Sequence, residues 1–210
     1  MKPEEFINEV IKLYQEARIS KYPHVKIRRG GSHTIASASE DLMATYLVSN
    51  NNQIDVVYVN QQINVPGIVK SFIPDIVIVS GGLITAFLDL KTNLGYMRDK
   101  LIELTEKDYH LINSVRGQNC TLYDGLSKEK MSFIISRSAN YDIVIISGEN
   151  ISKKLLQDQL EGAKPYKNDV SIHILSQGKY PGSYGLNPAE LFSKIEINKL
   201  AFNSILERIK

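Results

Sequence analysis

Residues 72–91 read FIPDIVIVSGGLITAFLDLK, and this stretch decides the fold. Two apolar runs within it, Phe72–Val79 and Leu83–Leu90, predict β-strands, because they are short, rich in branched residues and bounded by turn formers. Ser80–Gly82 lies between them and predicts the turn of a hairpin. The sequence therefore predicts a hairpin that is buried within an α/β domain.

Three charged residues stand near the ends of these apolar runs. Successive side chains of a strand point to opposite faces, so Asp89 and Lys91 share one face, and the hairpin can bring Asp75 beside them. Such charges are costly to desolvate unless something compensates them. A hard divalent cation would hold the two carboxylates, and Lys91 could orient or activate a water near the metal. This is the arrangement that metal-assisted hydrolysis of a phosphodiester needs.

Each charged residue also has an ordinary explanation. Asp75 could simply open a strand, and Asp89 with Lys91 could be a surface ion pair of almost no energetic value. The flanking runs Ile76–Val79 and Ala86–Leu90 are too apolar for an exposed hairpin. We therefore favour a functional site.

The Pro74-Asp75 and Asp89-Leu90-Lys91 clusters resemble the motif of the PD-(D/E)xK nuclease superfamily in its D-x-K form. Phe87–Tyr96, FLDLKTNLGY, resembles the segment that follows the catalytic strand in many type II restriction endonucleases. Ser37–Ala44, SASEDLMA, resembles the helix that carries an additional acidic residue in the same enzymes.

This resemblance implies a type II restriction endonuclease that uses Mg²⁺ to cleave double-stranded DNA at a short palindromic sequence, leaving 5′-phosphate ends. Asp75, Asp89 and Glu40 would be the metal ligands, and Lys91 would position the attacking water. A homodimer is expected, because a twofold protein matches a palindrome and supplies one active site per strand. A cognate DNA methyltransferase from the same operon would protect the host DNA without forming a stable complex.

Glu40 can be judged on a helical wheel. Its neighbours on the same face of the predicted helix include Met43, Ala44 and Leu47, so its carboxylate would face the core, where it needs a metal or a cation. The alternative is a capping box, in which Ser37 and Glu40 satisfy the first free N–H groups of the helix. Beside the downstream hairpin, we favour the active-site role.

The best candidate for DNA contact is the basic loop that precedes the Glu40 helix. It contains Lys26, Arg28, Arg29 and His33, whose side chains could reach phosphates or a guanine edge, although a solvated basic loop is an equal alternative. Arg98 could contact a phosphate near the scissile bond. The loop Gln177–Tyr184 is rich in hydrogen-bonding and aromatic side chains, and is a further candidate for reading bases.

Composition indicates a globular protein, with 43% hydrophobic and 23% charged residues in 210. A net charge of +2 means that nucleic-acid affinity must come from a local basic patch. The single cysteine, Cys120, excludes an intramolecular disulfide and a cysteine-based zinc site. There is no signal-peptide pattern and no apolar run of about 20 residues, so a soluble cytoplasmic protein without membrane contact is expected.

Helical periodicity alternates with short apolar runs along the chain. The predicted helices are Glu4–Arg18, Ile35–Val48, Met97–Ser114, Ile151–Gly162 and Pro188–Ile209, the last with Asn187 as its N-cap. The further predicted strands are Ile54–Asn60, Ser132–Ser136, Tyr141–Ser147 and Val170–Leu175. This order predicts a three-layer α/β sandwich with a mixed central sheet, restriction-endonuclease-like, in one endonuclease domain over residues 1–210.

Other classes of site lack support. The four histidines show no metal-binding spacing, and neither a phosphate-binding P-loop nor a G-x-S-x-G element is present. Two alternatives stay open: a DNA-repair or junction-resolving nuclease of the same superfamily, and a non-catalytic nucleic-acid-binding module with the same fold. The complete set of Asp75, Asp89 and Lys91 argues against the second.

Overall fold

The computed structural model describes residues 1–22, 24–26, 31–67, 71–95, 97–125 and 127–209. Its helices are α1 (Pro3–Glu16), α2 (Ala36–Asn50), α3 (Leu101–Val115), α4 (Lys153–Ala163), α5 (Pro188–Ser193) and α6 (Lys199–Arg208). Its strands are β1 (Val56–Val59), β2 (Ile63–Asn64), β3 (Ile76–Ser80), β4 (Leu83–Asn93), β5 (Asn119–Tyr123), β6 (Lys130–Ser147), β7 (Val170–Ile174), β8 (Ser176–Gly178) and β9 (Ile195–Ile197). A 3₁₀ turn, Lys164–Tyr166, follows α4.

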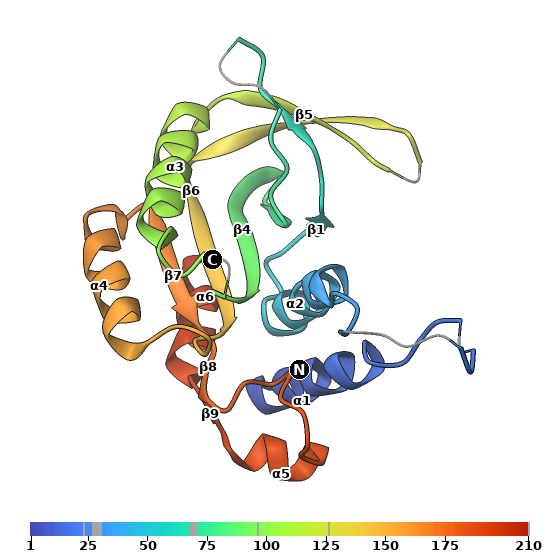
Figure 1. The fold of residues 1–210 in the computed structure, drawn as a ribbon. Coiled ribbons are helices and arrows are strands. Elements are labelled where there is room, and N and C mark those ends of the chain that lie inside the picture. Colours follow the sequence, from blue (N-terminus) through green and yellow to red (C-terminus); the bar gives the residue numbers. More distant parts are fainter. Residues whose placement is uncertain (23, 27–30, 68–70, 96, 126, 210) are drawn as a thin grey trace.

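Within these ranges, seven strands form one mixed sheet in the order β1-β3-β4-β6-β5-β2, and β7 also pairs with β6. The pairs β4–β6 and β6–β7 are parallel, whereas β1–β3, β3–β4, β5–β6 and β2–β5 are antiparallel. Figure 1 shows a curled sheet with helices on both sides of it. The fold is therefore mixed α/β, as the alternation of helical and apolar segments predicts.

The hairpin of β3 and β4 forms as the sequence predicts. Ser80 pairs with Leu83, so the turn consists of Gly81 and Gly82, which have φ values of 58° and 73°. A two-residue hairpin turn favours such positive φ values, and glycine adopts them without a steric penalty. The ladder of β3 begins at Ile76 rather than at Phe72, which instead forms an isolated bridge with Ile63.

Strand β6 is continuous over 18 residues, where the sequence predicts two strands. Its outer half pairs with β5 in a hairpin that projects from the body of the molecule (Figure 1). Its inner half lies in the core between β4 and β7. The register against β4 shifts between the halves, because Ile84 faces Ile135 and Ala86 faces Asn140. Residues 136–139 thus form an irregular stretch, named the excursion below, in which four residues of β6 lie opposite the single residue Thr85 of β4.

Two hydrophobic clusters lie on the two faces of the sheet. Helices α1, α2 and α6 cover one face, where the rings of Phe6, Tyr46 and Phe202 pack edge to face with centroids 5.1–5.8 Å apart. Helices α3 and α4 cover the other face and contribute Leu101, Ile112 and Leu156, among others. Because side chains alternate along each strand, β3 and β4 supply apolar residues to both clusters.

The C-terminal region corrects one prediction. Pro188–Ile209 is not one helix, because Ile195–Ile197 forms β9 and pairs with β8, a strand that the sequence does not predict. The side chain of Asn198 then accepts a hydrogen bond from Ala201 N at 3.2 Å and caps a separate helix, α6. The N-cap prediction is confirmed, since Asn187 Oδ1 accepts from Glu190 N at 2.9 Å. No helix in the described ranges is long and apolar enough to cross a membrane.

Candidate active site

The hairpin brings Asp75, Asp89 and Lys91 together. Asp75 immediately precedes β3, and the pairing of Ile76 with Leu88 places it beside the end of β4 that carries the other two. Leu90 N donates a hydrogen bond to Asp75 Oδ2 at 2.6 Å, which fixes this carboxylate against the neighbouring strand. The juxtaposition therefore follows from antiparallel register.

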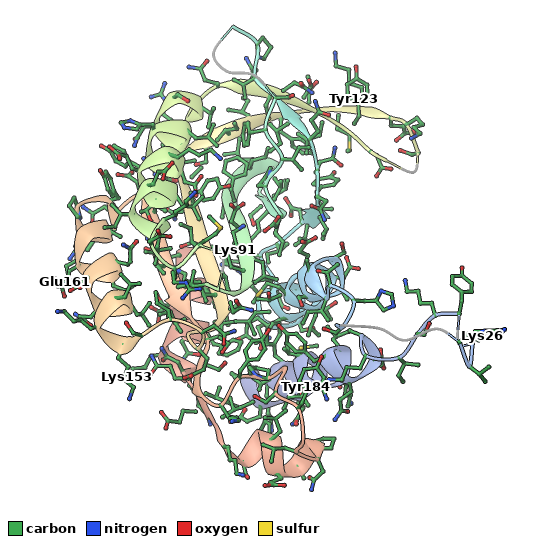
Figure 2. The ribbon with its side chains drawn as sticks, in the orientation of Figure 1. Lys26, Lys91, Tyr123, Lys153, Glu161 and Tyr184 are labelled. Atoms are coloured by element: carbon green, nitrogen blue, oxygen red, sulfur yellow. The ribbon has the colours of Figure 1, made fainter. Side chains whose placement is uncertain are left out.

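Lys91 lies between the two aspartates. Its Nζ is 3.6 Å from Asp75 Oδ2 and 3.5 Å from Asp89 Oδ2. The Lys91 side chain is 24% exposed. Solvent therefore screens its interactions with the two aspartates in part, but these are not fully exposed surface ion pairs. Figure 2 shows Lys91 in the middle of the molecule, at the end of β4 between α2, α3 and β6.

Tyr141 is a residue of this site that sequence reasoning missed. It is 3% exposed, and its hydroxyl donates to Asp89 Oδ1 at 2.9 Å. Tyr141 pairs with Phe87 in the parallel ladder of β4 and β6, so its ring lies on the same face as Asp89. Burial, and next the negative charges of Asp89 and Asp108, raise the pKa of Tyr141 well above its usual value, so the hydroxyl keeps its proton and acts as a donor.

Glu40 approaches from α2 and is 6% exposed. Asn60, at the end of β1, has a positive φ of 53° and donates a hydrogen bond from Nδ2 to Glu40 Oε2. The capping-box alternative does not hold, because the helix begins at Ala36 and its N-cap is Ile35 rather than Ser37. Glu40 therefore lies on the core side of α2, as the helical wheel predicts.

Burial raises the pKa values of three carboxyl groups in this region, and neighbouring carboxylates add to the effect. Burial, and next the charge of Asp75, raise the pKa of Glu40. Burial raises the pKa of Asp75, and Asp89 adds to this effect while Lys91 opposes it. Burial, and next the charge of Asp89, raise the pKa of Asp108 on α3 to about 7. The charge of Lys91 acts on all three of these acids, and Lys107 also acts on Asp108, so the carboxylates outnumber the ammonium groups and favour an added cation.

Mg²⁺ fits this donor set if water and substrate phosphates supply the remaining ligands. Within the described residues, no three Asp, Glu, His or Cys side chains are grouped closely enough to hold a metal ion. Magnesium, however, commonly binds through one or two carboxylates together with water and substrate phosphates, and not in a cage made only of protein ligands. Asp75 and Asp89 offer such a pair of hard oxygen ligands, with Glu40 nearby through its charge interaction with Asp75.

The residues predicted to contact DNA lie in different surroundings. Lys26 is exposed on a projecting segment between α1 and α2, well separated from Lys91 in Figure 2. Arg28 and Arg29 lie outside the described residues. His33 is attached to the body of the protein, since its N–H donates to Ala17 O at 2.7 Å. The structure thus does not bring Lys26 or His33 into the cluster around Lys91.

Arg98 lies closer to the end of β4. Its Nε donates to Gly95 O at 3.2 Å, and with Asn93, Gly95 and Asn150 it lines an open depression of about 490 Å³. A phosphate could be received there by the guanidinium and the amide side chains.

The loop Gln177–Tyr184 is partly built into the fold. Tyr180 OH lies 2.5 Å from Tyr14 OH and accepts a hydrogen bond from Asn93 Nδ2 at 3.0 Å. The guanidinium of Arg18 lies 4.2 Å from the centroid of the Tyr184 ring. Tyr180 therefore fastens the loop to β4 and α1, while the exposed Tyr184 keeps a surface position.

Asp108 is a second acidic residue that sequence reasoning missed. The buried face of α3 contains Leu101, Thr105, Asp108, Ile112 and Val115, so Asp108 stands on the apolar stripe of its helix as Glu40 does on α2. The same helical-wheel argument would have found it.

Comparison of the chain with protein-family models, with curated proteins and with solved structures finds no match. The function must therefore be argued from the site itself.

Proposed function

We propose that this protein is a Mg²⁺-dependent endonuclease of the PD-(D/E)xK type that cleaves double-stranded DNA at a short palindromic sequence, as type II restriction endonucleases do. One observation carries the proposal: Asp75, immediately before β3, and Asp89, on β4, flank Lys91 within 3.6 Å in a region where carboxylates outnumber cations. The mixed sheet with helices on both faces is compatible with a three-layer, restriction-endonuclease-like sandwich, which the proposal includes.

Each residue has a role that follows from its position. Asp75 and Asp89 would hold Mg²⁺, and Glu40 would complete the metal shell directly or through a water. When bound, Mg²⁺ would supply positive charge against the negative charge that develops on the scissile phosphate. Lys91 would orient the attacking water and stabilise the same charge. The N–H of Leu90 and the hydroxyl of Tyr141 hold the two aspartates in position.

The remaining parts of the proposal concern partners. Two copies of the chain would bind a palindromic site, so that each active site cuts one strand. The products would carry 5′-phosphate and 3′-hydroxyl ends, and a methyltransferase encoded nearby would protect the host DNA. Arg98 would contact a phosphate beside the scissile bond. Sedimentation equilibrium with uncleaved DNA in Ca²⁺ measures the stoichiometry, and an active complex of one chain per duplex would contradict the dimer.

The decisive experiment is digestion of a methylation-free plasmid in the presence and absence of Mg²⁺, followed by sequencing of the ends. We expect discrete, Mg²⁺-dependent fragments with 5′-phosphates. Asp89→Ala should give none, whereas Asp158→Asn, which changes an exposed acid on α4, should cut like the wild type. Cleavage confined to four-way junctions or flaps would identify a repair or junction-resolving nuclease instead. A protein that cuts neither substrate would contradict the nuclease proposal.

A further inference from the structure

The outer hairpin, formed by β5 and the outer half of β6, projects from the body of the molecule (Figure 1). Its two faces differ, because side chains alternate along each strand. One face carries Cys120 and Leu122, which are 1% and 0% exposed. On the same side, the hydroxyl of Tyr58 from β1 donates to Met131 Sδ at 3.1 Å, and the ring centroids of Tyr58 and Phe133 lie 6.1 Å apart. This core-facing side is thus occupied by the protein itself.

The other side of the outer hairpin, named the open face below, meets solvent. Three cross-strand pairs lie on it: Asn119 with Ile134, Thr121 with Ser132, and Tyr123 with Lys130. Thr121 is partly buried, and the other five residues are exposed. Five of the six side chains end in a hydroxyl, amide or ammonium group, and Lys130 alone carries a charge. The open face therefore suits a partner that offers hydrogen-bonding groups along an extended surface.

The charged residues of the hairpin are distributed unevenly between its two sides. Lys128 is exposed at the tip, and Arg137 is exposed just beyond the base. Asp124 N donates to Glu129 O at 3.0 Å, so these two acids continue the ladder one step beyond the open face and alternate to the core-facing side. Burial, and next the charge of Asp124, raise the pKa of Tyr58, which lies on that side. The two flanking cations and the lysine of the open face thus complement an anionic partner.

The shape of the hairpin matches the major groove of double-stranded DNA. Paired strands lie about 4.8 Å apart, so a two-stranded ribbon with its side chains fits a groove that is about 12 Å wide. The minor groove, at about 6 Å, is too narrow for it. Base edges in the major groove present donors and acceptors that hydroxyl and amide groups can bind, and the phosphates along its rims attract lysine and arginine.

We propose that the outer hairpin binds in the major groove of double-stranded DNA, with the open face toward the base edges. This inference rests on the proposed function for its partner, and it adds a contact surface that is separate from the catalytic cluster. Strand β4 sets the separation, because Leu83 pairs with Ile134 of the hairpin and Lys91 lies further along the same strand. The eight residue steps from Leu83 to Lys91 span at most roughly 26 Å, the length of about eight base pairs. The hairpin would therefore hold the duplex up to about eight base pairs from the scissile phosphate.

Fluorescence anisotropy with a labelled duplex of mixed sequence, measured in EDTA, tests the hairpin without any cleavage. Lys130→Ala should weaken binding several-fold and lower the slope of log affinity against log salt by about one, because one phosphate contact is lost. The matched control Lys167→Ala removes an exposed lysine from the turn before β7 and should change neither quantity.

A second pair of variants tests the open face itself. Ser132→Glu places a carboxylate in the middle of this face and leaves the core-facing side intact, so it should weaken DNA binding at least about tenfold. Asn168→Glu adds the same charge at an exposed position in the turn before β7 and should change the affinity less than about twofold. The circular dichroism spectra of both variants should match that of the wild type.

Modified duplexes identify the groove. Glucosylated 5-hydroxymethylcytosine fills the major groove and should weaken binding at least about tenfold, whereas netropsin, which occupies the minor groove, should have little effect. The reverse pattern, or wild-type affinity in both Lys130→Ala and Ser132→Glu, overturns the proposal. A dimer that Ser132→Glu converts to a monomer without loss of DNA affinity also overturns it, and assigns the open face to a second copy of the chain.

These titrations need no Mg²⁺, so their outcome is separate from that of the plasmid digestion. Hairpin variants that cut and bind DNA like the wild type refute only the hairpin proposal. A wild-type protein that binds DNA through the open face but cuts none refutes only the nuclease proposal.

Discussion

Two clusters of charge lie on the paired strands β4 and β6 and their neighbours, and they differ in how their charges are balanced. In the first, Asp142 is 0% exposed and its Oδ1 meets His173 Nε2 at 2.9 Å and Arg208 Nε at 2.7 Å. In the second, Asp75 and Asp89 share Lys91 at 3.5–3.6 Å. Asp142 pairs with Leu88 and Ile143 pairs with Asp89, so the clusters face opposite sides of the sheet.

Asp142 is held by partners within the fold, whereas the Lys91 cluster is the site proposed for catalysis. Asp142 Oδ1 receives partners from β7 and α6, which tie the C-terminal helix to the sheet, while its Oδ2 is buried without a hydrogen-bond partner in the described part of the chain. The Lys91 cluster gathers Asp75 and Asp89, whose charges act on Glu40 and Asp108, and burial is the largest cause that raises the pKa values of Asp75, Glu40 and Asp108. Removing one partner of a buried ion pair is strongly destabilising, whereas carboxylates in excess favour an added cation.

The largest effect on activity is expected when charges of the Lys91 cluster are removed. Asp75→Ala and Lys91→Ala should each lower the rate of Mg²⁺-dependent cleavage by roughly a thousandfold or more, because each removes a metal ligand or the water-positioning cation. Their thermal unfolding should stay close to that of the wild type. Plasmid cleavage rates and circular dichroism measure the two effects, and rapid cleavage by the Asp75 variant would exclude it as a ligand.

The first cluster should respond in the opposite way. Asp142→Asn should lower the free energy of unfolding by about 3–5 kcal/mol, because it removes the charge that His173 and Arg208 share in a buried site. Cleavage should be retained at temperatures where the variant is folded. Urea denaturation gives the free energy. A loss below about 1 kcal/mol would show that this cluster does not hold the C-terminal helix.

The raised pKa of Asp108 predicts how the free energy of unfolding changes with pH. Its pKa is about 7 in the folded protein against 3.8 for the free side chain, so the folded state binds more protons between these values. Stability from this group is present at low pH and is lost as the pH rises from about 4 to about 7. Asp108→Asn should therefore be more stable than the wild type by about 2–4 kcal/mol at pH 8, with little gain at pH 4. Urea denaturation across this range checks the sign, and a gain independent of pH would contradict it.

The smallest expected effect is stabilisation by the metal. Mg²⁺ that binds the folded state alone should raise the free energy of unfolding by up to about 2.7 kcal/mol at one hundred times its Kd. The double variant Asp75→Ala, Asp89→Ala should lose this gain, and the Asp142→Asn variant should keep it. Thermal unfolding with Mg²⁺ and after chelation measures the shift. An equal shift in the double variant would place the bound ion elsewhere.

The parts of the molecule that follow from local patterns could be predicted from the sequence. The hairpin was found because two apolar runs flank a pair of glycines, and the inward position of Glu40 follows from the face of a helix. Tyr141 is not predicted, because its contact with Asp89, 52 residues earlier in the chain, depends on the parallel pairing of β4 with β6. No short pattern encodes that pairing.

Other differences have equally physical origins. Ile195–Ile197 falls within the predicted helix Pro188–Ile209, but pairing with β8 satisfies its backbone instead. Asp108, like Glu40, is an acidic residue on the apolar face of a helix, and a helical wheel of residues 101–115 identifies it. The basic segment around Lys26 has no burial pattern from which a position could be derived, since its described side chains are exposed.

The excursion at residues 136–139 of β6 has a consequence for how such a chain can change over generations. It lies between the outer hairpin, where β6 pairs with β5, and the inner half, where Tyr141 pairs with Phe87. Insertions or deletions in the hairpin can be absorbed at this irregular stretch before they reach Asn140. The ladder that holds Tyr141 against Asp89 is therefore insulated from them, so the projecting hairpin can change in length while the hydrogen bond between Tyr141 and Asp89 is kept.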